Sequence, residues 1–182
     1  MSGFRKLGER EVWRGTVVWA AVGRHVAPDG TEFERDVVHH PGAVVVVPVI
    51  DDGAAVLLVR QYRAPLEREL LEVPAGKRDV QDERPEVTAM REMEEEVGMR
   101  AGRLEKLAEF YNSPGFCDEH SYLFMGLDLE PCPTSFQGVE ETHMTIERVE
   151  LADVPTLVSS GAIVDAKTII ALCLAREALS GR

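Results

Sequence analysis

Three glutamates stand close together in residues 76–99, whose sequence is GKRDVQDERPEVTAMREMEEEVGM. If this stretch is helical, Glu92, Glu95 and Glu96 fall within roughly one third of the helix circumference, with Arg91 pointing to their flank. Like charges at these spacings destabilise a helix slightly. Carboxylate oxygens are hard ligands, which suit Mg²⁺ or Mn²⁺ better than zinc. The cluster therefore indicates a divalent-cation site, although a run of glutamates alone is more typical of a solvated helix face.

The residues around these acids predict a helix that begins at Pro85 and ends at Gly98. Proline suits the first turn, where its missing N–H has no intrahelical partner, and glycine tolerates the left-handed backbone of a helix end. Asp82 and Glu83 precede the proline, where acids cap free amides. Five apolar residues take most of the arc opposite the acids: Val87, Ala89, Met90, Met93 and Val97. We therefore expect one packed face and one anionic face.

The composition limits the possible partners and compartments. A chain of 182 residues is long enough for one domain with a sizeable core. Its formal net charge of −12 disfavours non-specific binding to nucleic acid or to anionic membranes. No apolar run approaches the roughly 20 residues that span a bilayer, and the first residues lack the apolar core of a signal peptide. Cys117, Cys132 and Cys173 have no metal-ligand spacing, so we expect free thiols in a reducing cytoplasm.

The first 40 residues predict a small antiparallel sheet. Residues 12–26 are rich in β-branched and aromatic side chains, which is typical of one or two strands. A Pro-Asp-Gly turn follows, and residues 33–39 form the returning strand. His39 and His40 end this strand, and such a pair is more typical of surface decoration than of a ligand site. We expect residues 1–40 to form a subdomain of their own.

Residues 41–182 predict the main domain. Residues 42–50 are continuously apolar, as in a strand buried on both faces. A turn at Asp51-Asp52-Gly53 returns the chain through residues 54–60 as a central hairpin. Further strands are expected at residues 70–76, 104–110, 122–127 and 144–151, a short helix at 154–159, and a longer helix at 164–179. The last helix is expected to cover one face of the sheet.

The acidic stretch resembles the signature of the Nudix hydrolases. The residues that carry the resemblance are Gly76, Glu83, Arg91-Glu92, Glu95-Glu96 and Gly98-Met99. This sequence has six residues between the glycine and the first glutamate, where the family pattern has five. The resemblance implies an α/β fold, an α/β/α sandwich with a mixed sheet, here with the N-terminal antiparallel sheet added. It also implies that Glu92 and Glu96 bind Mg²⁺ or Mn²⁺, that Glu95 assists in catalysis and metal binding, and that the Ala75 carbonyl joins them. Glu83 would bind metal or brace the loop.

Within that family the chain is most similar to ADP-ribose pyrophosphatases. The segment Ser113, Pro114, Gly115 and Phe116 matches a substrate-binding loop of that group. Arg60 and Arg63 leave a core strand, where they could be solvated or could hold a phosphate through the guanidinium fork. A glutamate from the loop before residue 144 serves as general base in the group, and Glu140 aligns best, with Glu141 second.

The resemblance implies hydrolysis of ADP-ribose to AMP and ribose 5-phosphate by water attack at phosphorus, with a divalent cation. It also implies a homodimer formed through the N-terminal sheet, in which both subunits shape the adenine site. Another nucleoside diphosphate sugar or a dinucleotide is an alternative substrate. A non-catalytic ligand sensor is a further alternative, but it requires the loss of an acid or an attached DNA-binding segment, and all the acids of the signature are present.

Overall fold

The computed structural model describes residues 3–181. The chain divides into two compact units. The first contains residues up to 42 together with 110–121, and the second contains residues 43–109 and 122 onward. The expected N-terminal subdomain ended at residue 40. The first unit also includes the tip between two later strands, because Val38 and Cys117 form a parallel bridge.

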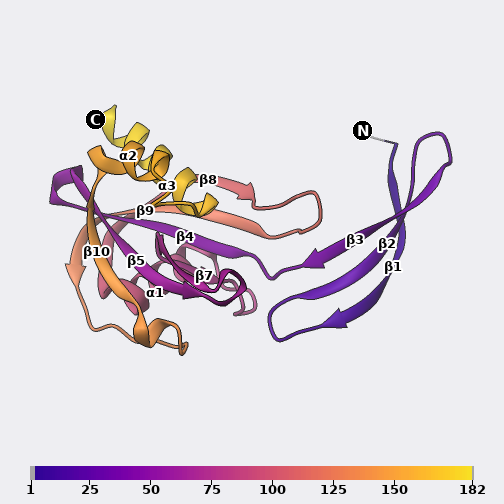
Figure 1. The fold of residues 1–182 in the computed structure, drawn as a ribbon, viewed down its shortest axis with the longest axis horizontal. Helices are drawn as coiled ribbons and strands as arrows, with labels where there is room; N and C mark the ends of the chain where they lie inside the picture. Colours follow the sequence, from indigo (N-terminus) through magenta and orange to yellow (C-terminus); the bar gives the residue numbers. More distant parts are fainter. Residues whose placement is uncertain (1–2, 182) are drawn as a thin grey trace. The chain divides into compact units, whose positions relative to one another are not determined.

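The first unit is a three-stranded antiparallel sheet in the order β1-β2-β3 (Figure 1). Its strands are β1 (Arg5–Arg14), β2 (Trp19–Val26) and β3 (Glu32–His39). The first strand begins at Arg5, well before residue 12, where the apolar pattern suggested a start. Every residue of β1 is exposed, so no buried face imposes the alternation of apolar residues by which a strand is recognised. His39 is not surface decoration. Its ring stacks on Trp19 and bonds to Asp118 at 2.5 Å and to Glu9 at 3.2 Å.

The second unit contains a seven-stranded sheet in which β10-β5-β4-β9-β8 form the main path, with β6 beside β5 and β7 beside β4. Its strands are β4 (Ala43–Ile50), β5 (Ala55–Arg63), β6 (Arg68–Glu72), β7 (Ala75–Lys77), β8 (Met99–Tyr111), β9 (His120–Pro131) and β10 (Thr145–Glu150). Its helices are α1 (Pro85–Val97), α2 (Val154–Ser159) and α3 (Ala166–Ser180). The other strands and the helices expected after residue 41 are present with shifted bounds, but the single strand expected at residues 70–76 is wrong. It is divided into β6, which pairs with β5, and β7, which pairs with β4.

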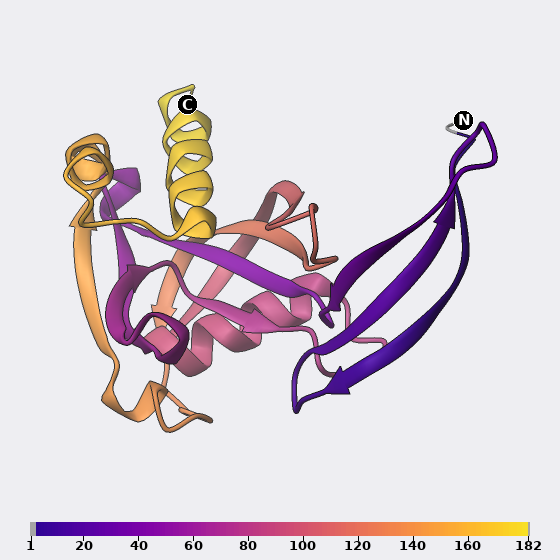
Figure 2. The same cartoon turned by 45° about the vertical axis from the view of Figure 1, so that its right-hand side comes forward.

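Helices cover both faces of this sheet. The helix α1 contacts β4, β5 and β7, and α3 contacts β4 from the other face (Figure 2). The expected α/β/α layering with an additional N-terminal sheet is therefore confirmed. Residues Val44, Val45, Val46 and Val47 of β4 are fully buried, as the continuous apolar run predicted. None of the described helices combines the length and the hydropathy that crossing a membrane requires.

The helix α1 begins and ends where the sequence predicted. Pro85 is its first residue, and Gly98 follows it with φ of 63°, donating its N–H to the Glu94 carbonyl at 3.1 Å. The predicted acidic cap is wrong, because Arg84 is the N-cap residue and no side chain bonds the free amides. Val87 is also exposed rather than packed. The buried arc consists of Thr88, Ala89, Glu92, Met93, Glu96 and Val97.

Candidate active site

Glu92 and Glu96 do not lie on a solvated face of α1 but on the face that contacts β7. Their residues are only 9% and 4% exposed. A Cβ atom on Gly76 would overlap the Glu92 carboxyl group, so only glycine allows β7 and this side chain to approach so closely. The Ala75 N–H donates to Glu96 Oε2 at 3.1 Å. Two helical carboxylates are therefore held directly against the backbone of residues 75 and 76.

This burial changes the charge state of both acids. It is the main cause that raises the pKa of Glu92 to about 7 and the pKa of Glu96 to about 8. Neighbouring carboxylates add to the effect, Glu95 on Glu92 and Glu92 on Glu96, whereas Arg91 lowers the pKa of Glu92. A site with this property favours either protons or a bound cation, because each neutralises the buried charge.

Arg91 lies inside the acidic cluster, so the expectation that it points to the flank is wrong. Its Nη1 atom is 2.8 Å from Glu92 Oε1 and 3.2 Å from Glu95 Oε2, and its Nη2 atom is 3.5 Å from Glu83 Oε2. Glu83 also accepts a hydrogen bond from Thr88 Oγ1 at 2.7 Å. Glu83 thus ties the loop before α1 to the helix, the contact expected of a residue that braces the loop.

Glu140 and Glu141 lie at a short 3₁₀ turn, residues 141–143, that precedes β10. The carboxylate of Glu141 accepts backbone N–H groups from Gln137 at 2.6 Å and Gly138 at 3.1 Å, which fix its position. Its charge contributes to the raised pKa of both Glu92 and Glu96, so it lies within electrostatic range of the cluster. Glu140 is not among the leading contributors to either. Of the two candidates for the base, Glu141 is therefore the one whose charge acts on the cluster.

The donor set of this site fits a hard divalent cation, since buried carboxylates and a backbone segment converge there. Within residues 3–181, no three or more Asp, Glu, His or Cys side chains are already arranged to hold a metal ion. The Arg91 guanidinium instead bridges Glu92 and Glu95. A bound cation would therefore need these side chains to exchange Arg91 contacts for metal contacts.

Arg60 and Arg63, the predicted phosphate-binding residues, both pair with carboxylates. Arg60 contacts Glu147 of β10 at 2.5 Å, and about a third of each side chain is exposed. Arg63 makes two hydrogen bonds to Glu72, at 2.8 and 2.6 Å, and Glu72 is 1% exposed. Sequence reasoning missed Glu72 as a partner. A lone acid in the apolar run of residues 70–73 was the available signal, because a buried carboxylate needs a paired cation.

The loop of residues 113–116 belongs to the first unit. It is a tight turn in which the Ser113 carbonyl accepts N–H groups from Phe116 at 3.1 Å and Cys117 at 2.9 Å. The Phe116 carbonyl in turn accepts the Val38 N–H of β3 at 2.7 Å. The Phe116 ring is exposed, with 57% of the residue accessible. The structure thus presents an aromatic side chain on a turn fixed by backbone hydrogen bonds.

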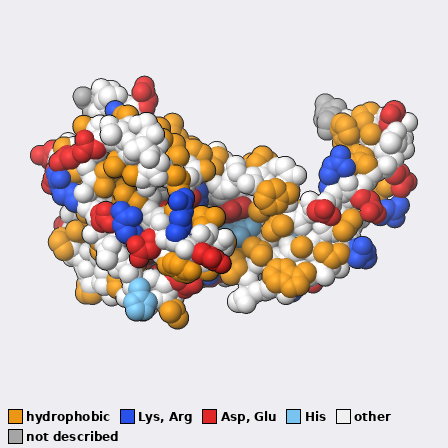
Figure 3. Space-filling model, in the orientation of Figure 1, with side chains coloured by type: hydrophobic (Ala, Val, Ile, Leu, Met, Phe, Trp, Pro, Cys, Tyr) orange, Lys and Arg blue, Asp and Glu red, His pale blue; other side chains and the backbone are white. Residues whose placement is uncertain are grey.

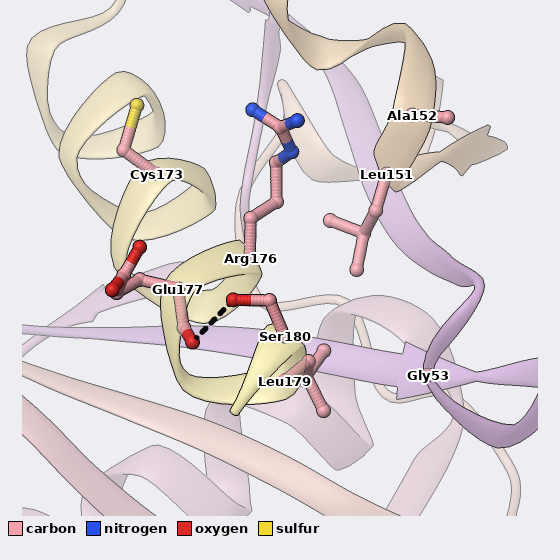
Figure 4. A pocket seen from close by; sticks show the side chains of 8 residues that line it. All are labelled: Gly53, Leu151, Ala152, Cys173, Arg176, Glu177, Leu179 and Ser180. Carbon is pink, nitrogen blue, oxygen red and sulfur yellow. Dashed lines mark hydrogen bonds between the residues drawn. The ribbon is translucent and has the colours of Figure 1, made fainter. Parts of the chain in front are cut away.

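A separate pocket lies at the C-terminal end of α3 (Figure 4). Arg176, Cys173 and Leu179 line it with residues from the turn after β4 and from the segment after β10. The Ser180 hydroxyl donates within the helix to the Glu177 carbonyl at 2.9 Å. None of the predicted site residues lies in this pocket, so it is distinct from the acidic cluster.

Comparison with known proteins identifies a family model, related sequences and a related fold. A model of the NUDIX domain matches residues 39–172. The chain is 38% identical over 168 residues to an ADP-ribose pyrophosphatase of Bacillus subtilis, covering 92% of this chain and 90% of the relative. It is 30% identical to a GDP-mannose pyrophosphatase of Cronobacter sakazakii, covering 82% of this chain and 84% of the relative. The solved structure of an ADP compounds hydrolase has a similar fold, with a TM-score of 0.85 at 24% identity over 98% of this chain and 95% of that one.

Proposed function

This chain belongs to the Nudix hydrolase family, and from that premise we propose that it hydrolyses ADP-ribose to AMP and ribose 5-phosphate in a Mg²⁺-dependent reaction. Mn²⁺ is the alternative metal. The observation that carries the proposal is the pair of buried carboxylates, Glu92 and Glu96, held against residues 75 and 76. The similarity to an ADP-ribose pyrophosphatase over 92% of the chain supports the choice of substrate.

Glu92, Glu96 and the Ala75 carbonyl would hold the metal, with Glu95 assisting. A bound divalent cation supplies charge neutralisation at the diphosphate and lowers the pKa of water. Arg91 opposes the charge of Glu92 and Glu95 when no cation is bound, and its long side chain allows it to withdraw. Because metal binding requires deprotonated carboxylates, the raised pKa values of Glu92 and Glu96 make metal affinity increase with pH.

Glu141 is the proposed general base, with Glu140 as the alternative. It would take a proton from the water that attacks a phosphorus atom, while the bond from that phosphorus to the bridging oxygen breaks and AMP and ribose 5-phosphate separate. The two backbone N–H groups that bind its carboxylate hold it in place without another side chain. Its electrostatic influence on Glu92 and Glu96 supports this choice.

Arg60 is better suited than Arg63 to bind a substrate phosphate. The Arg60–Glu147 pair is partly exposed, and such pairs contribute little stability, so a phosphate can compete for the guanidinium at small cost. Opening the Arg63–Glu72 pair would leave a buried carboxylate with the more distant Lys167, 3.9 Å away, as its cationic neighbour, which is unfavourable. We propose a substrate-binding role for residues 113–116 of the first unit, where Phe116 offers an exposed ring for stacking.

We further propose a cytoplasmic homodimer. The first unit exposes the large apolar side chains of Phe4, Leu7, Val12 and Trp13, and hydrophobic side chains are visible over its surface (Figure 3). Apolar groups exposed on a strand with an unpaired edge favour association with a second copy. The three cysteines are free, as expected for a reducing compartment.

A second substrate, GDP-mannose, is favoured by the similarity to a GDP-mannose pyrophosphatase. A hydrolysis screen decides between them, with Mg²⁺ and ADP-ribose, GDP-mannose, UDP-glucose, NADH and diadenosine polyphosphates, and with EDTA as the control. We expect the highest kcat/KM for ADP-ribose and AMP among the products. A preference for GDP-mannose would keep the reaction class and overturn the substrate. Absence of turnover on every compound would overturn the proposed function.

A further inference from the structure

The segment of residues 73–76, which carries the candidate metal ligand Ala75, is fixed to the rest of the second unit at three consecutive residues. The Ala75 N–H donates to Glu96 Oε2 at 3.1 Å. The Pro74 carbonyl accepts the Val46 N–H of β4 at 3.0 Å. The Val73 N–H donates to Thr168 Oγ1 at 3.0 Å. The first two contacts come from the acidic helix and the central strand, and the third comes from α3 on the opposite face of the sheet.

Thr168 is itself oriented by a second residue of the same helix end. Asp165 is the N-cap of α3, and its Oδ2 atom accepts the Thr168 N–H at 2.9 Å and the Thr168 hydroxyl at 2.8 Å. Because the hydroxyl donates its one proton to Asp165, its lone pairs remain available for the Val73 N–H. Thr168 is fully buried, so no water replaces this contact if the hydroxyl is removed.

Lys167, at the same end of α3, links Asp165 to Glu72 of β6. Lys167 Nζ lies 2.7 Å from Asp165 Oδ1 and 3.9 Å from Glu72 Oε2, and Glu72 is paired with Arg63. Burial alone would raise the pKa of Asp165, but Lys167 and Thr168 outweigh it and lower that pKa. Asp165 therefore remains charged and keeps the Thr168 hydroxyl oriented at neutral pH.

We propose that Thr168 is a positioning residue for the metal site, acting through Val73 on Ala75 and Glu96. The ring of Pro74 fixes its own φ angle, so few backbone rotations separate the anchored Val73 from Ala75. Loss of the hydroxyl leaves the buried Val73 N–H without a partner, and the segment must shift to satisfy it. Such a shift moves the Ala75 carbonyl and weakens the Ala75–Glu96 contact. This inference rests on the proposed function, because it assumes that Ala75 and Glu96 bind metal.

The test is Mn²⁺ binding to the full-length protein after metal removal, measured by electron paramagnetic resonance, together with kcat and KM for ADP-ribose. Thr168→Val has nearly the same shape but no hydroxyl, and Thr168→Ser keeps the hydroxyl. Leu172→Ala is the matched control, because it truncates another fully buried residue of α3 that carries no polar group. Circular dichroism confirms that each variant is folded at the assay temperature.

We expect Thr168→Val to weaken Mn²⁺ binding about tenfold, as for other residues that orient metal ligands. Thr168→Ser should remain within about twofold of wild type, and so should Leu172→Ala despite its lower melting temperature. Equal Mn²⁺ affinity in Thr168→Val and wild type overturns the proposal. An equal loss in Leu172→Ala also overturns it, because general destabilisation would then explain the effect.

If Thr168→Val does not fold, Asp165→Ala tests the same contacts from their other end. It leaves the Thr168 hydroxyl free to rotate away from Val73, so Mn²⁺ affinity should fall, and unchanged affinity overturns the proposal. The wild-type protein separates this inference from the proposed function. If the wild type binds no Mn²⁺, the proposed metal site is itself wrong. If the wild type binds Mn²⁺, the affinities of the variants decide the role of Thr168.

Discussion

The metal-free protein should lose stability as the pH rises from about 5 to about 8. The ordinary pKa of a glutamate is 4.5, and burial raises the folded-state pKa of Glu92 to about 7 and of Glu96 to about 8. Between these values the folded state holds protons that the unfolded state has released. Unfolding therefore becomes more favourable as protons become scarce. The loss from Glu92 is complete near pH 7, and that from Glu96 continues to about pH 8.

The size of the effect follows from the difference in pKa. At 1.36 kcal/mol per pKa unit, the change for Glu92 from 4.5 to about 7 lowers the free energy of unfolding by on the order of 3 kcal/mol. Glu96 acts in the same direction. Such a loss is a large part of the roughly 5–15 kcal/mol that holds a domain folded. A cation that binds the deprotonated acids reverses the trend, so stabilisation by Mg²⁺ should increase over the same pH range.

Urea denaturation in EDTA, at several values from about pH 5.5 to about pH 8.5, measures this slope directly. Glu92→Gln removes one of the two titrating groups and should make the dependence on pH shallower. Glu94→Gln is the matched control, since Glu94 lies on the same helix and pairs with Arg100 outside the cluster. A free energy of unfolding that stays constant or rises over this range in wild type would refute the reasoning about buried charge. An equal flattening by Glu94→Gln would refute its assignment to the cluster.

Three further outcomes are expected. Gly76→Ala places a methyl group on the Glu92 carboxylate and should cost about 1–3 kcal/mol of stability by thermal denaturation, whereas Gly8→Ala, with open space around it, should be nearly neutral. Glu141→Gln should lower kcat for ADP-ribose about 10²–10⁴-fold in steady-state kinetics, and Glu140→Gln much less; the reverse order would make Glu140 the base. Light scattering of the full chain should give the mass of a dimer, and a monomer would contradict the proposed association.

The sequence predicted the central features of the second unit because strong local signals specified them. Continuous valines marked β4 as a buried strand, and Pro85 and Gly98 marked the ends of α1. The pattern of acids predicted that Glu92 and Glu96 share one site, and the structure places Glu92 beside Gly76 and Glu96 beside the Ala75 N–H. Each of these signals depends on residues near one another in the chain.

The rest depended on contacts between distant segments. A helical wheel describes one helix but not its neighbours, so it placed Glu92 and Glu96 on an anionic face opposite the packed one and Val87 in the packed arc. The approach of β7 to α1 reversed that assignment. The partner of Arg63 is nine residues away, and the contact from Thr168 to Val73 spans 95 residues. The lone acid at position 72 indicates that a cation must pair with it but not which one, and no local pattern indicates the contact between Thr168 and Val73.

The central claim is that Glu96 belongs to a metal-dependent site that hydrolyses ADP-ribose, and one comparison of matched variants tests it most directly. Hydrolysis of ADP-ribose with Mg²⁺ is measured for wild type, Glu96→Gln and Glu94→Gln. The Gln side chain can still accept the Ala75 N–H, so the fold should be retained. A metal ligand contributes several kcal/mol of stabilisation to the transition state. We therefore expect Glu96→Gln to decrease kcat/KM more than about 100-fold and Glu94→Gln to change it little. Wild-type activity in a folded Glu96→Gln protein would contradict the account.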